Sequence, residues 1–231
     1  MNKHIAVLDK GFVKYIDHMG SDQRIVETAR VSYASTSKGA EKDKKLLNFL
    51  YKERHTSPFE SCMISFNIKL PLFVQGQMVR HRTQKLNQVS ARYTEMPDEF
   101  YFPESLRKQD SVNKQGSVDD GYFNPFVGYN ESATQSIKDV CTHAYSTYKA
   151  MVDAGVAREM ARMVLPQNLY TEIRTTWDLH NLMHFLTLRM DHHAQKEVQE
   201  YANAMYEITK ELFPQTIGAF DRYKWKVTEE H

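Results

Sequence analysis

Residues 62–93 read CMISFNIKLPLFVQGQMVRHRTQKLNQVSARY, and this stretch decides the fold. Over residues 62–69 apolar side chains alternate with more polar ones, which is the pattern of a strand with one buried face. Pro71 then suits the first turn of a short helix, which we expect from Leu72 to about Arg82. A strand followed at once by a helix indicates a chain that combines both kinds of structure.

The flanking sequence predicts further strands and helices on both sides of this stretch. Apolar periodicity, turn residues and helix caps place each of them. Before residue 62 we expect a hairpin of residues 5–7 and Phe12–Ile16 about the turn Asp9-Lys10-Gly11, a helix capped by Ser21, and a helix over about Glu41–Glu53. After residue 93 we expect a helix through Ile137–Val152 ended by Gly155, a helix over Arg158–Leu165, an extended segment over Tyr170–Trp177, a helix capped by Asp178, and a last helix over about Ala194–Leu212.

One α+β domain over residues 1–231 accounts for this order of elements. We expect a central, mainly antiparallel sheet packed by helices, with a helical C-terminal half. No internal repeat, low-complexity tract or linker divides the chain. Residues 103–130 are the least regular part, with Gly116, Gly121, Pro125 and Gly128 among polar residues, so we predict a long surface loop there.

The composition excludes several classes of protein. Thirty basic and 29 acidic side chains give a formal charge of +1, which argues against a nucleic-acid coat or a polybasic membrane binder. Two cysteines are too few for a disulfide scaffold. The N-terminal residues lack the apolar core of a signal peptide, and no stretch is apolar over a bilayer's length. We therefore expect a cytoplasmic protein with no membrane or nucleic-acid partner.

The charge is nevertheless uneven. Residues 61–94 contain no Asp or Glu, but five cations: Lys69, Arg80, Arg82, Lys85 and Arg92. Guanidinium groups with hydroxyl and backbone N–H donors are the groups that bind phosphate, and residues 80–93 are rich in them. A basic surface whose arginines pair with acids elsewhere explains the pattern equally well. A nucleic-acid-binding module is a third, weaker interpretation of the same residues.

Two other groups of residues suggest a ligand site. Arg189 and His193 are four residues apart, so they share a face if helical geometry continues between them, and Arg162 adds a cation among apolar residues. Surface ion pairs with Glu159 or Glu197 are the alternative. In residues 54–60, Ser57 and Glu60 have the form of a capping box, so a structural role accounts for both. The capping box does not account for His55.

Histidines could instead hold a metal. His180 and His184 have a spacing that can bind zinc, and with Asp191 and His192 they suggest a metal-dependent nucleotide hydrolase. The general-base Glu of an HExxH motif is missing, so a structural role or contact with an organic ligand is favoured, and we expect no metal. Neither a dinucleotide-binding glycine motif nor a P-loop is present, and no cysteine lies beside an activating group.

The spacing of Arg80-His81-Arg82, seven residues and Ser90 resembles the signature of the flavin-dependent thymidylate synthase family. Segments 55–60, 157–171, 182–202 and 213–223 are also similar to family sequence in the same order, so the resemblance is interrupted only in residues 103–130. It implies a homotetrameric α+β enzyme with active sites at subunit junctions. Such an enzyme converts dUMP to dTMP with methylenetetrahydrofolate, FAD and NADPH, and needs no cysteine nucleophile.

The resemblance also implies roles for particular residues. Arg189 and His55 would be catalytic, with Arg189 against the uracil ring. The residues implied for dUMP are Gln77, Met78, Val79, Arg80, Gln88, Val89, Ser90, Ala91, Arg92, Arg162 and Arg189. Those implied for FAD are Ser32, His55, Ser57, Glu60, Arg80, His81, Arg82, Asn87, Gln88, Asp178, His180, His184 and His193.

Two departures from the family pattern leave an altered pyrimidine nucleotide or product open. The family usually has Glu at the position of Gln88, and an amide keeps an acceptor but loses the charge. Asp178, His180 and His184 stand where many members carry Asn, Arg and Asn, which puts the cofactor contacts there in question.

Overall fold

A computed structural model of the chain describes residues 3–32, 34–114, 116–118, 125 and 132–223. Its centre is a five-stranded sheet in the order β1-β2-β3-β7-β4, in which every neighbouring pair is antiparallel. Its strands are β1 (His4–Val7), β2 (Gly11–Met19), β3 (Met63–Pro71), β7 (Tyr170–Asp178) and β4 (Lys85–Gln88). The α+β class and the antiparallel sheet are therefore confirmed.

The strand β3 is the middle strand, and its alternation sets the two faces of the sheet. Ile64, Phe66 and Ile68 are fully buried, whereas the intervening side chains are only half-buried. On the polar face Ser65 bonds Thr176 of β7 at 2.8 Å, and the Asn67 amide donates to Glu172 at 2.5 Å. The predicted strand is therefore confirmed, because its two faces meet different surroundings.

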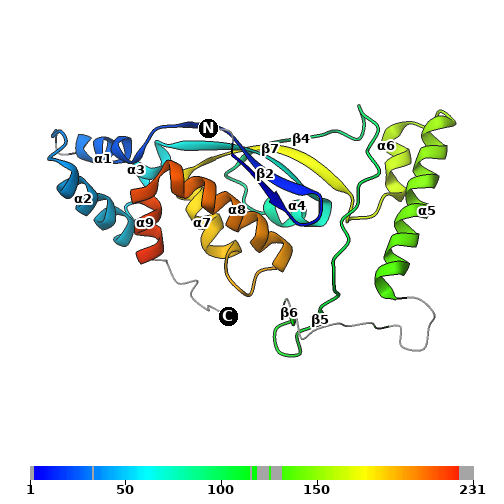
Figure 1. Cartoon of the computed structure of the whole chain (residues 1–231). Coiled ribbons are helices and arrows are strands. Elements are labelled where there is room, and N and C mark those ends of the chain that lie inside the picture. Colours follow the sequence, from blue (N-terminus) through cyan, green and yellow to red (C-terminus); the bar gives the residue numbers. More distant parts are fainter. Residues whose placement is uncertain (1–2, 33, 115, 119–124, 126–131, 224–231) are drawn as a thin grey trace.

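Helices cover the apolar side of the sheet and both of its ends. Figure 1 shows α4 (Leu72–Met78), α7 (Leu179–Arg189) and α8 (Lys196–Leu212) along the sheet. At one end lie α1 (Asp22–Val31), α2 (Ala40–Lys52), α3 (Ser57–Glu60) and α9 (Pro214–Arg222), and at the other lie α5 (Ala133–Asp153), α6 (Arg158–Ala161) and the 3₁₀ turn η1 (Arg162–Val164). None of the helices in the described ranges is long and apolar enough to cross a membrane.

The predicted helix caps are confirmed at three places. The Ser21 hydroxyl accepts from the Arg24 N–H, and the Asp178 carboxylate accepts from the Asn181 N–H at 2.9 Å. Gly155 follows α5 with φ +86°, the left-handed conformation that glycine adopts without strain. These caps fix where α1 and α7 begin and α5 ends.

Several boundaries differ from the prediction. The helix expected to reach Arg82 ends at Met78, because the Met78 carbonyl turns back to accept from the His81 N–H at 3.1 Å. The strand β4 was not predicted, since Leu86 is the one apolar side chain in it. The helix α9 was not predicted either, although Pro214 at its first turn is a start signal.

The segment expected as a long surface loop contains a small hairpin. Its strands are β5 (Lys108–Gln109) and β6 (Ser117–Val118), which pair with each other and not with the main sheet. Residues 115, 119–124 and 126–130 of the predicted loop lie outside the described residues.

Candidate active site

A cavity of about 530 Å³ opens between β4 and the η1 turn. Gln88, Val89, Ser90 and Ala91 line one side, and Arg162 lines the other. These two groups lie about 70 residues apart in the sequence, and the pairing of β4 with β7 brings them together. The fold therefore gathers much of the predicted dUMP set around one cavity, together with the predicted FAD residue Asn87.

The arginines of the predicted ligand sets differ in their partners. Arg92 forms an exposed ion pair with Glu159 at 3.0 Å, so the surface-pairing alternative holds for Arg92. Arg80, Arg82 and Arg162 are exposed, and no carboxylate among the described residues pairs with them. Arg162, which lines this cavity, is therefore available to an anionic ligand there, and Arg80 and Arg82 are available in the turn before β4.

The Gln88 side chain forms hydrogen bonds with other residues of the chain. Its amide oxygen accepts from the Gln75 amide at 2.7 Å, and its nitrogen donates to the Thr171 hydroxyl at 3.1 Å. Thr171 is buried and also lines the cavity. Neither Gln75 nor Thr171 was predicted, because no local pattern links residues 13 and 83 positions from Gln88.

His81 and Arg189 meet at the centre of the molecule. The Arg189 Nε–H donates to His81 Nε2 at 3.0 Å, so this nitrogen of the imidazole is unprotonated. Burial, together with the charges of Arg189 and His184, lowers the pKa of His81 to about 4. Burial also lowers the pKa of Arg189. The neutral imidazole therefore orients the guanidinium group.

The turn that carries Arg80, His81 and Arg82 is fastened by Gln84. The Gln84 amide donates to the carbonyl of Met78 at 2.7 Å, and its oxygen accepts from Thr175 of β7 at 2.6 Å. The Met78 side chain is fully buried in the core, and the place of Met78 in the dUMP set stays a prediction. Val79 remains exposed beside it.

A second cavity, of about 990 Å³, is lined by Gln77, Arg189 and His193. The helical continuity assumed between Arg189 and His193 is wrong, since α7 ends at Arg189 and α8 begins at Lys196. His193 is instead held by Asp191, which accepts from its backbone N–H at 2.9 Å and lies 2.8 Å from its ring. A turn thus brings both predicted residues to one cavity.

The ion pairs weighed against a ligand role for Arg162 and Arg189 are absent among the described residues. Glu159 pairs with Arg92, and Glu197 pairs with Arg107. Both acids thus form salt bridges, Glu159 with Arg92 of the predicted dUMP set and Glu197 with Arg107, which the sequence did not single out.

A third cavity, of about 730 Å³, lies between α1, α2 and α3 and collects Ser32, His55 and Ser57. The His55 ring stacks on Phe49, with centroids 5.7 Å apart. The predicted capping box is wrong, because Thr56 precedes α3 and makes no side-chain cap bond, and Ser57 is inside the helix. Glu60 is exposed at the end of α3.

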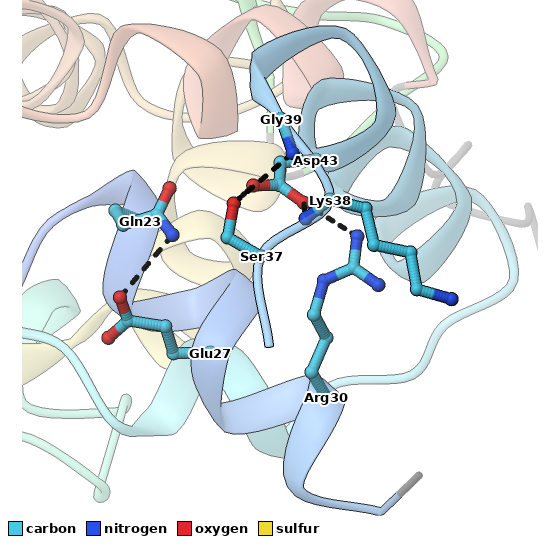
Figure 2. Close-up of polar contacts among 7 residues, drawn as sticks. All are labelled: Gln23, Glu27, Arg30, Ser37, Lys38, Gly39 and Asp43. Atoms are coloured by element: carbon cyan, nitrogen blue, oxygen red, sulfur yellow. Dashed lines mark hydrogen bonds and ion pairs between the residues drawn. The ribbon is translucent and has the colours of Figure 1, made fainter. Parts of the chain in front are cut away.

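Arg30, which lines this third cavity, belongs to a buried ion pair whose contacts are drawn in Figure 2. The Arg30 guanidinium donates to Asp43 at 2.6 Å, and the Ser37 hydroxyl and the Lys38 N–H donate to the same carboxylate. The hydroxyl of Ser37, followed by Arg30 and Lys38, holds the pKa of Asp43 below its ordinary value. Arg30 Nε is buried and has no hydrogen-bond partner among the described residues.

The alternative metal set of His180, His184, Asp191 and His192 does not form one cluster among the described residues. His184 lies by His81, with ring centroids 6.2 Å apart, while Asp191, His192 and His193 form a separate group on the other side of Arg189 in the chain. The set of four ligands suggested for a hydrolase is therefore not assembled. Asp178 serves as the cap of α7 and also accepts from the Asn181 amide.

Both cysteines are unsuited to nucleophilic chemistry. Cys62 and Cys141 are buried, and burial raises the pKa of each thiol. This agrees with the sequence, in which no activating group adjoins either cysteine.

Comparison with known proteins identifies close relatives along nearly the whole chain. The family described as "Thymidylate synthase complementing protein" matches residues 14–215. Flavin-dependent thymidylate synthases from Thermus thermophilus and Treponema denticola are 48% and 44% identical, covering 95% and 97% of this chain and 78% and 84% of the relatives. The flavin-dependent thymidylate synthase from Kosmotoga olearia is 45% identical, and the match covers 94% of this chain and 92% of that relative.

A solved structure has a similar fold. The UMP/dUMP methylase PolB from Streptomyces cacaoi, bound with 5-Br dUMP, superposes with a TM-score of 0.83 at 30% identity. The match covers 95% of this chain and 98% of the other.

Proposed function

Because this chain belongs to the family of flavin-dependent thymidylate synthases, we propose that it methylates dUMP to dTMP with methylenetetrahydrofolate as carbon donor and NADPH-reduced FAD as hydride source. As a family member it is a flavin-dependent enzyme that transfers a one-carbon group to a pyrimidine nucleotide. The observation that carries the proposal is the cavity at β4, where Gln88–Ala91 and Arg162 converge.

In this proposal the nucleotide phosphate is bound at the β4 cavity. Ser90 and Arg162 line it, and the unpaired Arg80 lies exposed in the turn before β4. Charge-assisted hydrogen bonds from guanidinium groups suit a phosphate. Arg189, held by His81, then supplies a fixed cation that favours the N3-deprotonated uracil.

The cavity between α1, α2 and α3 fits a flat, polar cofactor such as a flavin. The exposed His55–Phe49 stack offers a ring surface, and the buried, unpartnered Arg30 Nε is a donor without an acceptor. Ser32 and Ser57 would add hydroxyl contacts there, and His81, Asp178, His180, His184 and His193 would complete the flavin site from other elements. When bound, FAD supplies the hydride, while the protein orients the ring and excludes water.

We propose a homotetramer whose active sites lie where subunits meet. Within one subunit the predicted residues line three separate cavities, containing Ser90 and Arg162, Arg189 and His193, and His55 and Ser57. Closed symmetric assembly can join different surfaces of identical chains into one site. Exposed Val89, Tyr93 and Met163 around the β4 cavity supply apolar surface for such contacts.

A visible spectrum of the purified protein tests the proposal. We expect flavin absorbance, and oxidation of the reduced flavin that depends on dUMP and the folate. Arg189→Ala should lower kcat/KM by about 100-fold or more, as expected for loss of a cation facing developing charge. Arg222→Ala, at an exposed arginine of α9, is the matched control. A colourless protein that cannot take up FAD contradicts the proposal.

A second candidate is methylation of UMP as well as dUMP. It is favoured by the similarity to PolB, which is a UMP/dUMP methylase, and by the neutral Gln88 where the family usually has Glu. Turnover measured with both nucleotides distinguishes the two, since a thymidylate synthase alone shows no product from UMP.

A further inference from the structure

The β5–β6 hairpin, defined here as residues 107–114 and 116–118, lies apart from the main sheet in Figure 1. It is held together by its own polar contacts. The Asp110 carboxylate accepts from the backbone N–H groups of Val112 and Asn113, and the Asp110 N–H donates to the Gly116 carbonyl at 3.1 Å. No described residue of the hairpin belongs to either hydrophobic cluster, so apolar packing does not fix its position.

A buried ion pair ties this hairpin to the helix α8. One guanidinium nitrogen of Arg107 lies 2.7 and 2.9 Å from the two carboxylate oxygens of Glu197, and Arg107 Nε donates to Ser117 at 2.9 Å. The Tyr101 hydroxyl donates to the same carboxylate at 3.2 Å. The Glu197 side chain is only 5% exposed, so the pair is shielded from water and from salt.

The position of Glu197 in the helix strengthens this tie. Glu197 is the second residue of α8, where the N-terminal end of the helix favours a negative charge. Arg107, which lies in the hairpin 90 residues earlier in the sequence, supplies the positive charge of the pair. Removing either charge leaves the other buried without a partner, which is costly.

The hairpin forms one wall of the 990 Å³ cavity at Arg189. Gln109, Asp110, Asn113 and Ser117 line it opposite the end of α7, where Arg189 is found. Glu197 does not line this cavity but a neighbouring one beside Tyr101, so it does not face a ligand of Arg189. Its effect on that ligand must therefore pass through the hairpin.

We infer that Glu197 is a positioning residue for the nucleotide: its ion pair with Arg107 holds the β5–β6 hairpin as the wall that closes the cavity over the ligand of Arg189. The inference rests on the proposed function, because it assigns the hairpin to that site. Loss of the pair loosens the wall while leaving Arg189 and His81 in place. Loss of the pair should therefore weaken nucleotide binding more than it slows turnover of the bound nucleotide.

The test uses the full-length, FAD-loaded enzyme with Glu197→Gln, which keeps the shape of the side chain and removes its charge. We expect the KM for dUMP, and its Kd by calorimetry, to rise about tenfold, while kcat changes by less than about twofold. Trypsin should cut faster after the exposed Lys108 and Lys114 at a temperature well below unfolding. Glu207→Gln, an exposed acid on the same helix, is the matched control and should change none of these.

A second variant separates positioning from general destabilisation. Arg107→Gln combined with Glu197→Gln leaves no unpaired charge, so it should regain stability while the Kd for dUMP stays raised, because the tie to the hairpin is still missing. A fall in kcat with unchanged KM, or unchanged cleavage and unchanged Kd in Glu197→Gln, would overturn the inference. If the wild-type enzyme does not methylate dUMP, the proposed function is wrong, and the cleavage assay still decides whether Glu197 holds the hairpin.

Discussion

At the scale of single residues, His81 is the side chain on which most of the predicted site depends. It lies between Arg189, which donates to it, and the rings of Phe185 and His184, with centroids 4.9 and 6.2 Å away. The sequence marks His81 as one of three consecutive polar residues and, through the family signature, as a member of the predicted FAD set. Its neutral state and its bond to Arg189 come from burial and from a contact across 108 positions of sequence.

This neutral state predicts a pH dependence of stability. The pKa of His81 is about 4 in the folded chain and about 6.5 when unfolded, so between these values the unfolded chain binds more protons. The free energy of unfolding should therefore fall as the pH drops from about 6.5 toward 4, by at most about 3 kcal/mol from this group. We expect the melting temperature of His81→Gln to change less with pH over this range than that of the wild type.

His184 remains in that variant and also has a lowered pKa, so some pH dependence persists. His143→Gln, at an exposed position of α5, serves as the control and should leave the profile as in the wild type. An identical profile for His81→Gln and the wild type would show that His81 is not kept neutral by the fold.

At the scale of elements, the connection between α1 and α2 depends on one carboxylate. Asp43 on α2 accepts from Arg30 on α1 and from Ser37 and Lys38 in the connection between them. The three donors converge from a short stretch of chain, so the ion pair both joins two helices and shapes the segment before α2. The cavity that contains Ser32 and His55 has this segment as part of its wall.

Asp43→Asn should therefore cost about 3 kcal/mol in the free energy of unfolding, because it leaves the buried Arg30 without a counter-charge. We also expect a lower flavin content after purification, measured as the ratio of flavin to protein absorbance. Asp153→Asn removes one partner of the exposed Lys149–Asp153 pair on α5 and should cost less than about 0.5 kcal/mol. Equal effects of the two substitutions would contradict the structural role of Asp43.

At the scale of the whole molecule, the proposed site is spread over a chain with helices at both ends of the sheet. The β4 cavity lies toward α5 and α6, whereas the cavity with His55 lies among α1, α2 and α3 at the opposite end (Figure 1). In the homotetramer that we propose, a neighbouring subunit presents its opposite end and so completes the site.

Complementation between two inactive variants tests this arrangement. We expect co-expressed His55→Ala and Arg162→Ala chains to regain as much as about a quarter of the wild-type activity, since random assembly restores some sites with both intact residues. Sedimentation should give a mass of about four chains of 27.0 kDa. Mixed particles that stay inactive would show that each subunit builds its site alone. Each variant expressed by itself is the control.

Local sequence determined many of the helices and strands, though not β4 or α9, because periodicity and capping are properties of neighbouring residues. The strand at 63–71, the caps Ser21 and Asp178, and the stop at Gly155 could all be read from a few positions each. The acid-free window around Arg80 and Ser90 also pointed to an anion site before any contact was known.

Tertiary structure decided which residues meet, because those contacts join distant parts of the chain. The pairing of β4 with β7 places Ser90 by Arg162, although β4 has almost no apolar pattern of its own. Glu197 could be named from the sequence as an ion-pair partner, but its actual partner is Arg107, since the fold brings the hairpin onto α8. Burial then sets the charge of His81, and burial depends on the whole packed chain.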